Sequence, residues 1–232
     1  SAQTSELIES ARPGGEPRAP SARKRFSARD LSILAWSFAA LDIGDSTLLE
    51  ALSSASITSI PVFKAQDLTN PVWSFARLAL ADLPLLTAIS ESAIPRIRQF
   101  VAKEISNIAW AYATLSVGDG PLLAALSAQA IQSIPHCDPQ ILSNIAWSCA
   151  RLSFHHEPLR AALSSAALPK LADFVPQGLS TTAWAFAQLR VRDAPLMPAI
   201  ASQSIPRMSA CGRGGFSLQA LANTAWAFAE LS

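Results

Sequence analysis

Apolar side chains recur along this chain at helical spacing within one repeated pattern. The clearest copy is ISNIAWAYATL, at residues 105–115. Counted from its tryptophan and stepped by about 100° per residue, the apolar positions −5, −1, +2 and +5 fall within one arc of about 140° to 260°. The pattern predicts an amphipathic helix, which in this copy covers about residues 103–116.

A second amphipathic helix follows each copy and opens with Pro-Leu-Leu or a close variant. Asp82, Asp119 and Asp193 stand two residues before a proline, and a short acidic residue followed by proline favours a helix start. Prolines also recur late in this second helix, where they are expected to end or kink it and let a short second turn begin. They are Pro95, Pro169 and Pro206.

The pair of helices repeats along most of the chain. Its tryptophans are Trp36, Trp73, Trp110, Trp147, Trp184 and Trp226. The period is 37 residues until the last copy, which has five extra residues placed in a Gly-rich loop around 211–215. One pair cannot bury its apolar face alone, so pairs must stack. The sequence therefore predicts an all-α fold, an α-solenoid of about six stacked 37-residue helical-hairpin repeats over residues 26–232. Pro71 is expected to shorten or kink its helix.

The first helix of each repeat has a polar arc, formed by positions −7, −3, +1 and +4, which we expect on the concave face. Position −3 holds Asn70, Asn107, Asn144 and Asn223, and position +4 holds Arg77, Thr114, Arg151 and Gln188. Lys103 occupies position −7. The Asn row fits ligand contacts and equally fits a hydrogen-bond ladder between repeats. The variable +4 row fits a reader of one ligand unit per repeat, but also an unconstrained solvent-facing position.

The tryptophan row has two interpretations. Tryptophan stacks on bases in single-strand binders, at about 1–3 kcal/mol per base. Tryptophan flanked by alanine is also typical of packing between repeats, and we favour packing.

Composition limits the classes of function. Half of the residues are apolar and the formal net charge is +1, so no overall basic field points to nucleic acid. Residues 1–25 are rich in Pro, Gly, Ser and Arg, which predicts a flexible basic linker. No apolar run is long enough for a membrane span.

No arrangement of residues in the sequence predicts catalysis. Cys137, Cys149 and Cys211 match no metal or disulfide spacing. His136 precedes Cys137 without an acid placed to orient it, and His155-His156 replaces a capping residue at a turn, where we expect it to be solvated. We therefore expect no enzyme, metal, cofactor or small-molecule substrate.

The segments ISNIAWAYATL, ILSNIAWSCARL, LSTTAWAFAQL and LANTAWAFAEL resemble octotricopeptide and heptatricopeptide repeats. The resemblance covers about residues 26–232. It implies an organellar RNA-binding protein, in mitochondrion or chloroplast, that acts in RNA processing, stability or translation, often with a C-terminal RAP domain that these residues do not contain. Single-stranded RNA would then lie on the polar arc. The alternative is a scaffold that binds a peptide or protein partner on the same face.

Overall fold

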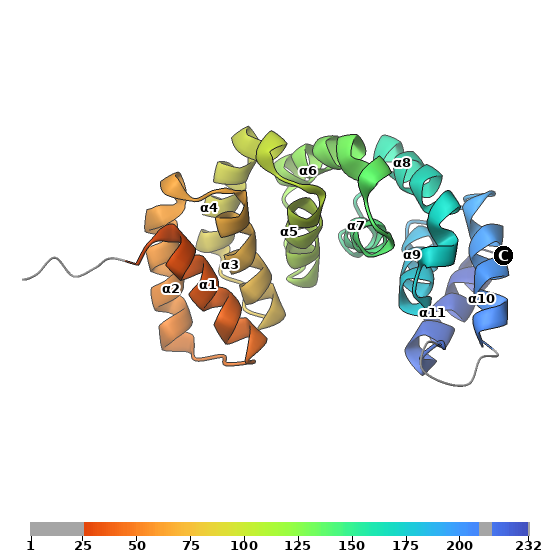
Figure 1. Cartoon of the computed structure of the whole chain (residues 1–232), viewed down its shortest axis with the longest axis horizontal. Coiled ribbons are helices and arrows are strands. Elements are labelled where there is room, and N and C mark those ends of the chain that lie inside the picture. The colour runs from red at the N-terminus through yellow and green to blue at the C-terminus, as the bar shows by residue number, and fades with distance from the viewer. Residues whose placement is uncertain (1–25, 209–214, 232) are drawn as a thin grey trace, which may run out of the picture.

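The computed structural model describes residues 26–208 and 215–231, and these residues form eleven α-helices and no strand. The helices are arranged as an arch, with one helix of each repeat on the inner side and its partner on the outer side (Figure 1). The predicted all-α solenoid is confirmed. The predicted linker, residues 1–25, and most of the Gly-rich insertion lie outside the described residues.

The helices that carry the tryptophan pattern line the inner side of the arch (Figure 1). These inner helices are α1 (Ala28–Ala40), α3 (Ala65–Arg77), α5 (Ala102–Thr114), α7 (Pro139–Arg151), α9 (Pro176–Gln188) and α11 (Leu218–Glu230). The outer helices are α2 (Ser46–Ser59), α4 (Leu83–Ala93), α6 (Gly120–Ser133), α8 (Glu157–Ala167) and α10 (Leu196–Met208). Short 3-10 helices follow four of the outer helices: η1 (Ile60–Val62), η2 (Ile94–Gln99), η3 (Ile134–His136) and η4 (Leu168–Asp173).

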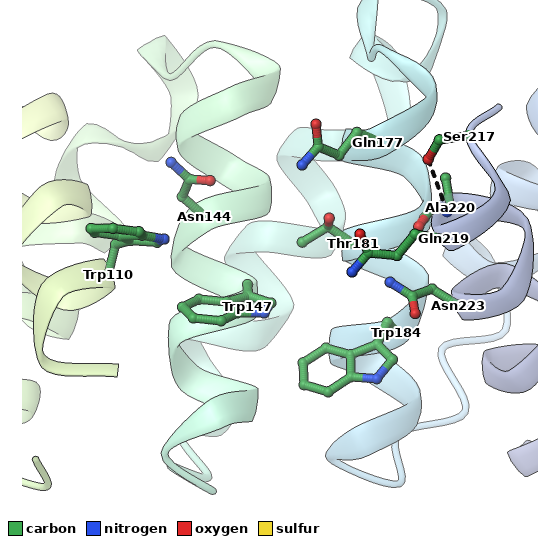
Figure 2. Close-up of a pocket in the computed structure, with 11 residues that line it drawn as sticks. Trp110, Asn144, Trp147, Gln177, Thr181, Trp184, Ser217, Gln219, Ala220 and Asn223 are labelled. Atoms are coloured by element: carbon green, nitrogen blue, oxygen red, sulfur yellow. Dashed lines mark hydrogen bonds between the residues drawn. The ribbon is translucent and has the colours of Figure 1, made fainter. Parts of the chain in front are cut away.

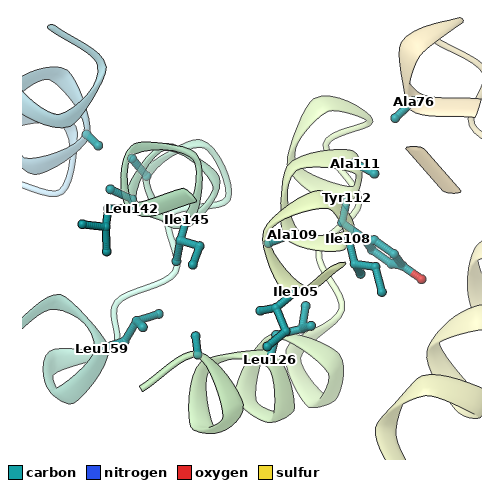
Figure 3. Close-up of a cluster of buried hydrophobic side chains, with 14 of the residues drawn as sticks. Ala76, Ile105, Ile108, Ala109, Ala111, Tyr112, Leu126, Leu142, Ile145 and Leu159 are labelled. Atoms are coloured by element: carbon teal, nitrogen blue, oxygen red, sulfur yellow. The ribbon is translucent and has the colours of Figure 1, made fainter. Parts of the chain in front are cut away.

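The hydrophobic core runs along the arch between the inner and outer layers. In the third repeat, Ile105, Ile108 and Tyr112 of α5 are buried together with Leu126 of α6 (Figure 3). The Tyr112 hydroxyl donates a hydrogen bond to the Leu86 carbonyl in α4, at 2.7 Å, and so links this repeat to the preceding one. Every repeat thus depends on its neighbours for burial of its apolar face.

Successive inner helices pack directly against each other through small side chains. The alanine at position +3 is fully buried in α1, as Ala39, but exposed in α11, as Ala229. Position +1 shows the opposite trend, since Ser37 of α1 is partly exposed whereas Ala227 of α11 is fully buried. The next inner helix therefore covers position +3, and the preceding one covers position +1.

The helix starts follow the predicted caps. Asp82, Asp119 and Asp193 each accept a hydrogen bond from the backbone N–H three residues later, at 2.9–3.0 Å. The fourth repeat uses a histidine instead, because His156 Nδ1 accepts the N–H of Leu159 at 3.1 Å. His155 is exposed, as expected of a solvated side chain, whereas His156 is partly buried and caps α8.

The prolines behave as expected at two of three late positions. Pro95 and Pro169 lie in the first turns of η2 and η4, where the outer helix has ended. Pro206 differs, because it lies inside α10, which continues to Met208. Pro71 lies inside α3, yet α3 has the same 13 residues as the other inner helices, so the expected shortening is wrong. The flanking helices α1 and α5 pack against α3, and such tertiary packing overrides local propensity.

Cationic side chains provide a further link between repeats, which the sequence pattern did not predict. Arg96, Lys170 and Arg207 each follow one of the late prolines. Each donates a hydrogen bond to the backbone carbonyl oxygen 33 residues earlier, at 2.7, 2.7 and 2.5 Å. These three cations therefore act within the fold and satisfy carbonyl groups of the preceding repeat.

We expect Ala113→Leu to lower the free energy of unfolding by roughly 1–3 kcal/mol, because Ala113 is fully buried where inner helices meet and has no room for a larger side chain. Urea denaturation measures this change. Ala124→Leu, at an exposed position of α6, is the matched control and should change it by less than about 0.5 kcal/mol. Equal effects of both substitutions would contradict close packing of the inner helices.

Candidate functional site

Two of the hollows that open on the inner helices are lined by the same positions of successive repeats. The first has a volume of about 560 Å³ and lies over α5, α7, α9 and α11 (Figure 2). The second, of about 740 Å³, lies over α1, α3 and α5. Side chains at the repeat positions −7, −3 and 0 predominate in both linings, so the two hollows belong to one face of the arch. Among the residues lining the first are Trp110, Asn144, Trp147, Gln177, Thr181, Trp184, Gln219 and Asn223. Among those lining the second are Ile33, Trp36, Gln66, Asn70, Trp73, Lys103, Glu104 and Asn107.

The asparagines at position −3 all line these hollows, as the polar arc predicted. Only Asn70 takes part in an inter-repeat hydrogen bond, from its Nδ2 to Ser32 Oγ at 2.9 Å. Within the described part of the chain, the side-chain amides of Asn107, Asn144 and Asn223 make no hydrogen bond to protein. The ladder interpretation therefore holds for one junction, and three amides remain available to a ligand.

The tryptophans both contact each other and line the hollows. Trp73 and Trp110 have ring centroids 6.3 Å apart, and Trp184 and Trp226 have centroids 6.4 Å apart, each pair tilted by 33–36°. These contacts join neighbouring inner helices, as the packing interpretation expects. Trp147 has no ring contact within the described residues, although its indole lines the first hollow. The row is therefore not a continuous stack.

The side chains at position +4 are placed differently from the asparagines. Arg77, Arg151 and Gln188 are exposed in the last turns of their helices and line neither hollow. A cation in this place also complements the negative end of the helix dipole. Thr114 does not present its hydroxyl group to the face, because its Oγ1 is buried and has no hydrogen-bond partner. The side chains at position +4 therefore lie beside the two hollows and do not line them.

Position +1 does not belong to the accessible surface, so its assignment to the polar arc is wrong. Ser74 and Ser148 are almost fully buried, and each hydroxyl donates to the backbone carbonyl oxygen four residues earlier at 2.7 Å. The helical angle places this position at the edge of the arc, and the preceding inner helix covers it. An isolated helix gives no information about that neighbour.

The glutamines at position −7 are additional lining residues. Gln177 and Gln219 line the first hollow, and Gln66 lines the second. In this row, charge alone singles out Lys103 as a candidate ligand contact. The repeat register alone would have identified the glutamines.

The charges of the two hollows differ. The lining of the first contains indole, amide, hydroxyl and methyl groups but no charged side chain. The lining of the second contains Lys103 together with Glu104, so its formal charges balance. An anionic group would find no cation in the first hollow, whereas a neutral planar group would find rings and amides there.

Cys149, His155 and His156 line one cavity of about 190 Å³ at the start of α8. No group of three or more His, Cys, Asp or Glu side chains that could hold a metal ion is found in the described residues. Burial raises the pKa of the Cys149 thiol to about 12, and burial also raises the pKa of Cys137. Both thiols are therefore protonated at neutral pH, and a thiol is a much weaker nucleophile than a thiolate.

Membrane crossing depends on the length and the apolar character of a helix. No helix among the described residues combines the length and the apolar character needed to span a membrane.

Comparison with known proteins gives one family. A family model described as RNA-editing substrate-binding complex 6 protein matches residues 17–158, which is more than half of the chain. The matched range includes α1 to α7 and ends within the first turn of α8. It therefore covers all residues of the second hollow and part of the first. No curated protein matches the chain.

We expect Asn70→Ala to lower the free energy of unfolding by about 1 kcal/mol, because buried Ser32 would lose its hydrogen-bond donor. Asn107→Ala is the matched control at the same repeat position and should change it by less than about 0.5 kcal/mol. Thermal or urea denaturation of the two variants measures both values. A similar loss in Asn107→Ala would show that this amide also serves packing.

Proposed function

The chain belongs to the family of RNA-editing substrate-binding complex 6 proteins, and from this premise we propose that it is a non-catalytic module that binds single-stranded RNA on its inner face and acts in RNA processing. The observation that supports this proposal best is the set of amides without protein hydrogen bonds beside partly exposed indoles in the two hollows. Amides can pair with base edges, and indoles stack on base faces. The partners of such a module are RNA and the protein components of a complex.

A few cations in or beside the hollows provide the contacts to phosphate. Lys103 lines the second hollow, and Arg77 and Arg151 are exposed at the ends of α3 and α7. Each cation that neutralises a phosphate of a single strand contributes about −0.7 to the slope of log affinity against log salt concentration. With three such cations we expect a slope of only about −2. In this proposal, binding depends more on bases than on the backbone.

The repeat type and the location are finer parts of the proposal. The resemblance to octotricopeptide and heptatricopeptide repeats supports a repeat protein of that kind, with one 37-residue unit per repeat. The same resemblance supports an organelle, and we propose the mitochondrion. The family match concerns RNA editing and offers no support for a chloroplast.

A protein-binding scaffold is the second candidate. It is favoured by the absence of charged side chains from the lining of the first hollow, since neutral amides can also pair with the backbone of an extended peptide. The two candidates differ in their response to salt, because a neutral peptide releases no condensed counterions.

We expect Lys103→Ala to weaken RNA binding at low salt and to make the salt slope shallower by about 0.7, because one phosphate contact is lost. Affinities of the purified chain for a pool of single-stranded RNAs, measured over a series of salt concentrations, give both slopes. Arg98→Ala is the control, since Arg98 is an exposed cation in η2 that lines neither hollow. The proposal fails if no RNA in the pool shows salt-sensitive binding.

We expect an antibody against the chain to label mitochondria in cell fractions and sections. Recovery of the protein only in another compartment would contradict the proposed location while leaving the RNA-binding test unaffected.

A further inference from the structure

The first hollow contains one tryptophan that is unlike the other interior ones. Trp73, Trp110 and Trp184 each have a ring contact to a neighbouring indole. Trp147 has no ring partner among the described residues and is partly exposed in the hollow. Figure 2 shows its indole between Trp110 on one side and Trp184 on the other. Trp147 therefore takes no part in the ring contacts that join neighbouring repeats.

Groups that can pair with a planar ligand surround this indole. The Asn144 amide lies on the same helix, and Gln177 and Thr181 project from α9 on the adjacent side of the hollow (Figure 2). Neither Asn144 nor Gln177 has a side-chain hydrogen bond within the described residues. The edge of a ring stacked on Trp147 would thus face side chains that offer both hydrogen-bond donors and hydrogen-bond acceptors.

The charge of the hollow selects which part of a nucleotide enters. No charged side chain lines it, so a phosphate placed there would lose water without gaining a cation. A neutral base loses less on desolvation and gains an indole face and amide partners. A volume of about 560 Å³ is within the range of small-ligand sites and accommodates a base with room for solvent.

We propose that Trp147 is the stacking platform for one unpaired nucleobase, whose edge pairs with Asn144 and Gln177 while the flanking phosphates stay outside the first hollow. This inference rests on the proposed RNA-binding function and assigns it a specific position on α7. It also distinguishes Trp147 from Trp73 and Trp110, whose rings contact each other at the junction of α3 with α5.

The test compares Trp147→Ala with Trp226→Ala, which alters a tryptophan at the same repeat position that has a ring partner and lines neither hollow. Short single-stranded homopolymers of adenosine, cytidine and uridine serve as probes. We expect Trp147→Ala to lose about 5- to 150-fold in affinity with an unchanged melting temperature, because one stacked base is lost. Trp226→Ala should lower the melting temperature, because it removes the ring contact to Trp184, and should change affinity much less.

Two further measurements keep the result independent of folding defects. Gln177→Ala removes an exposed side chain, so it should weaken binding without altering stability. The ratio of affinities between the original chain and Trp147→Ala should stay constant as salt rises, because stacking releases no counterions. A merely structural tryptophan would not give a salt-independent ratio together with an unchanged melting temperature.

The outcomes separate the two proposals. If the original chain binds RNA but Trp147→Ala and Gln177→Ala bind equally well, the stacking site is overturned and the RNA-binding function stands. Equal losses of affinity in Trp147→Ala and Trp226→Ala also overturn it. If the original chain binds none of the homopolymers and none of the pooled RNAs, both proposals fail. Occupation of the hollow by an aromatic peptide alone would then favour the scaffold function.

Discussion

Close contact between successive inner helices is the constraint on which the rest of the structure depends. Small side chains at positions +1 and +3, such as Ala111 and Ala113, are fully buried and let the helices approach. Successive inner helices contact each other more extensively than successive outer helices do. Closer packing on one layer bends the array toward that layer, which explains the arch with the inner helices on its concave side (Figure 1).

The candidate site is a consequence of this packing. Once positions +1 and +3 are used for contact, positions −7, −3 and 0 line the two hollows, and most side chains at position +4 are exposed outside them. The side chains in the hollows are mainly amides and indoles, with Lys103 as a cation in the second hollow, so the inner face is suited to bases or peptide groups more than to phosphates. Departures from strict repetition then make individual repeats distinct, as with Asn70, which is bonded to Ser32, and Trp147, which has no ring partner.

Much of the fold could be predicted because each element has a local cause. The aspartate caps, the apolar stripe and the prolines after the outer helices act within one or two turns, so their effects are visible in the sequence. The hydrogen bonds of the cationic side chains have no such local cause, since Arg96 and Lys170 donate to carbonyl oxygens 33 residues earlier. The intact helix around Pro71 likewise depends on neighbours that a local pattern does not describe.

The sequence by itself determined the period of the helical pairs and the polar positions −7 and −3 that line the inner face, because helical periodicity depends on spacing alone. Only the tertiary structure decided which of the repeated side chains are free. It buried position +1 under the preceding helix and paired Asn70 with Ser32. It also left Trp147 alone while its neighbours made ring contacts. The reason is that exposure and pairing depend on the distance to the next helix, which no single repeat contains.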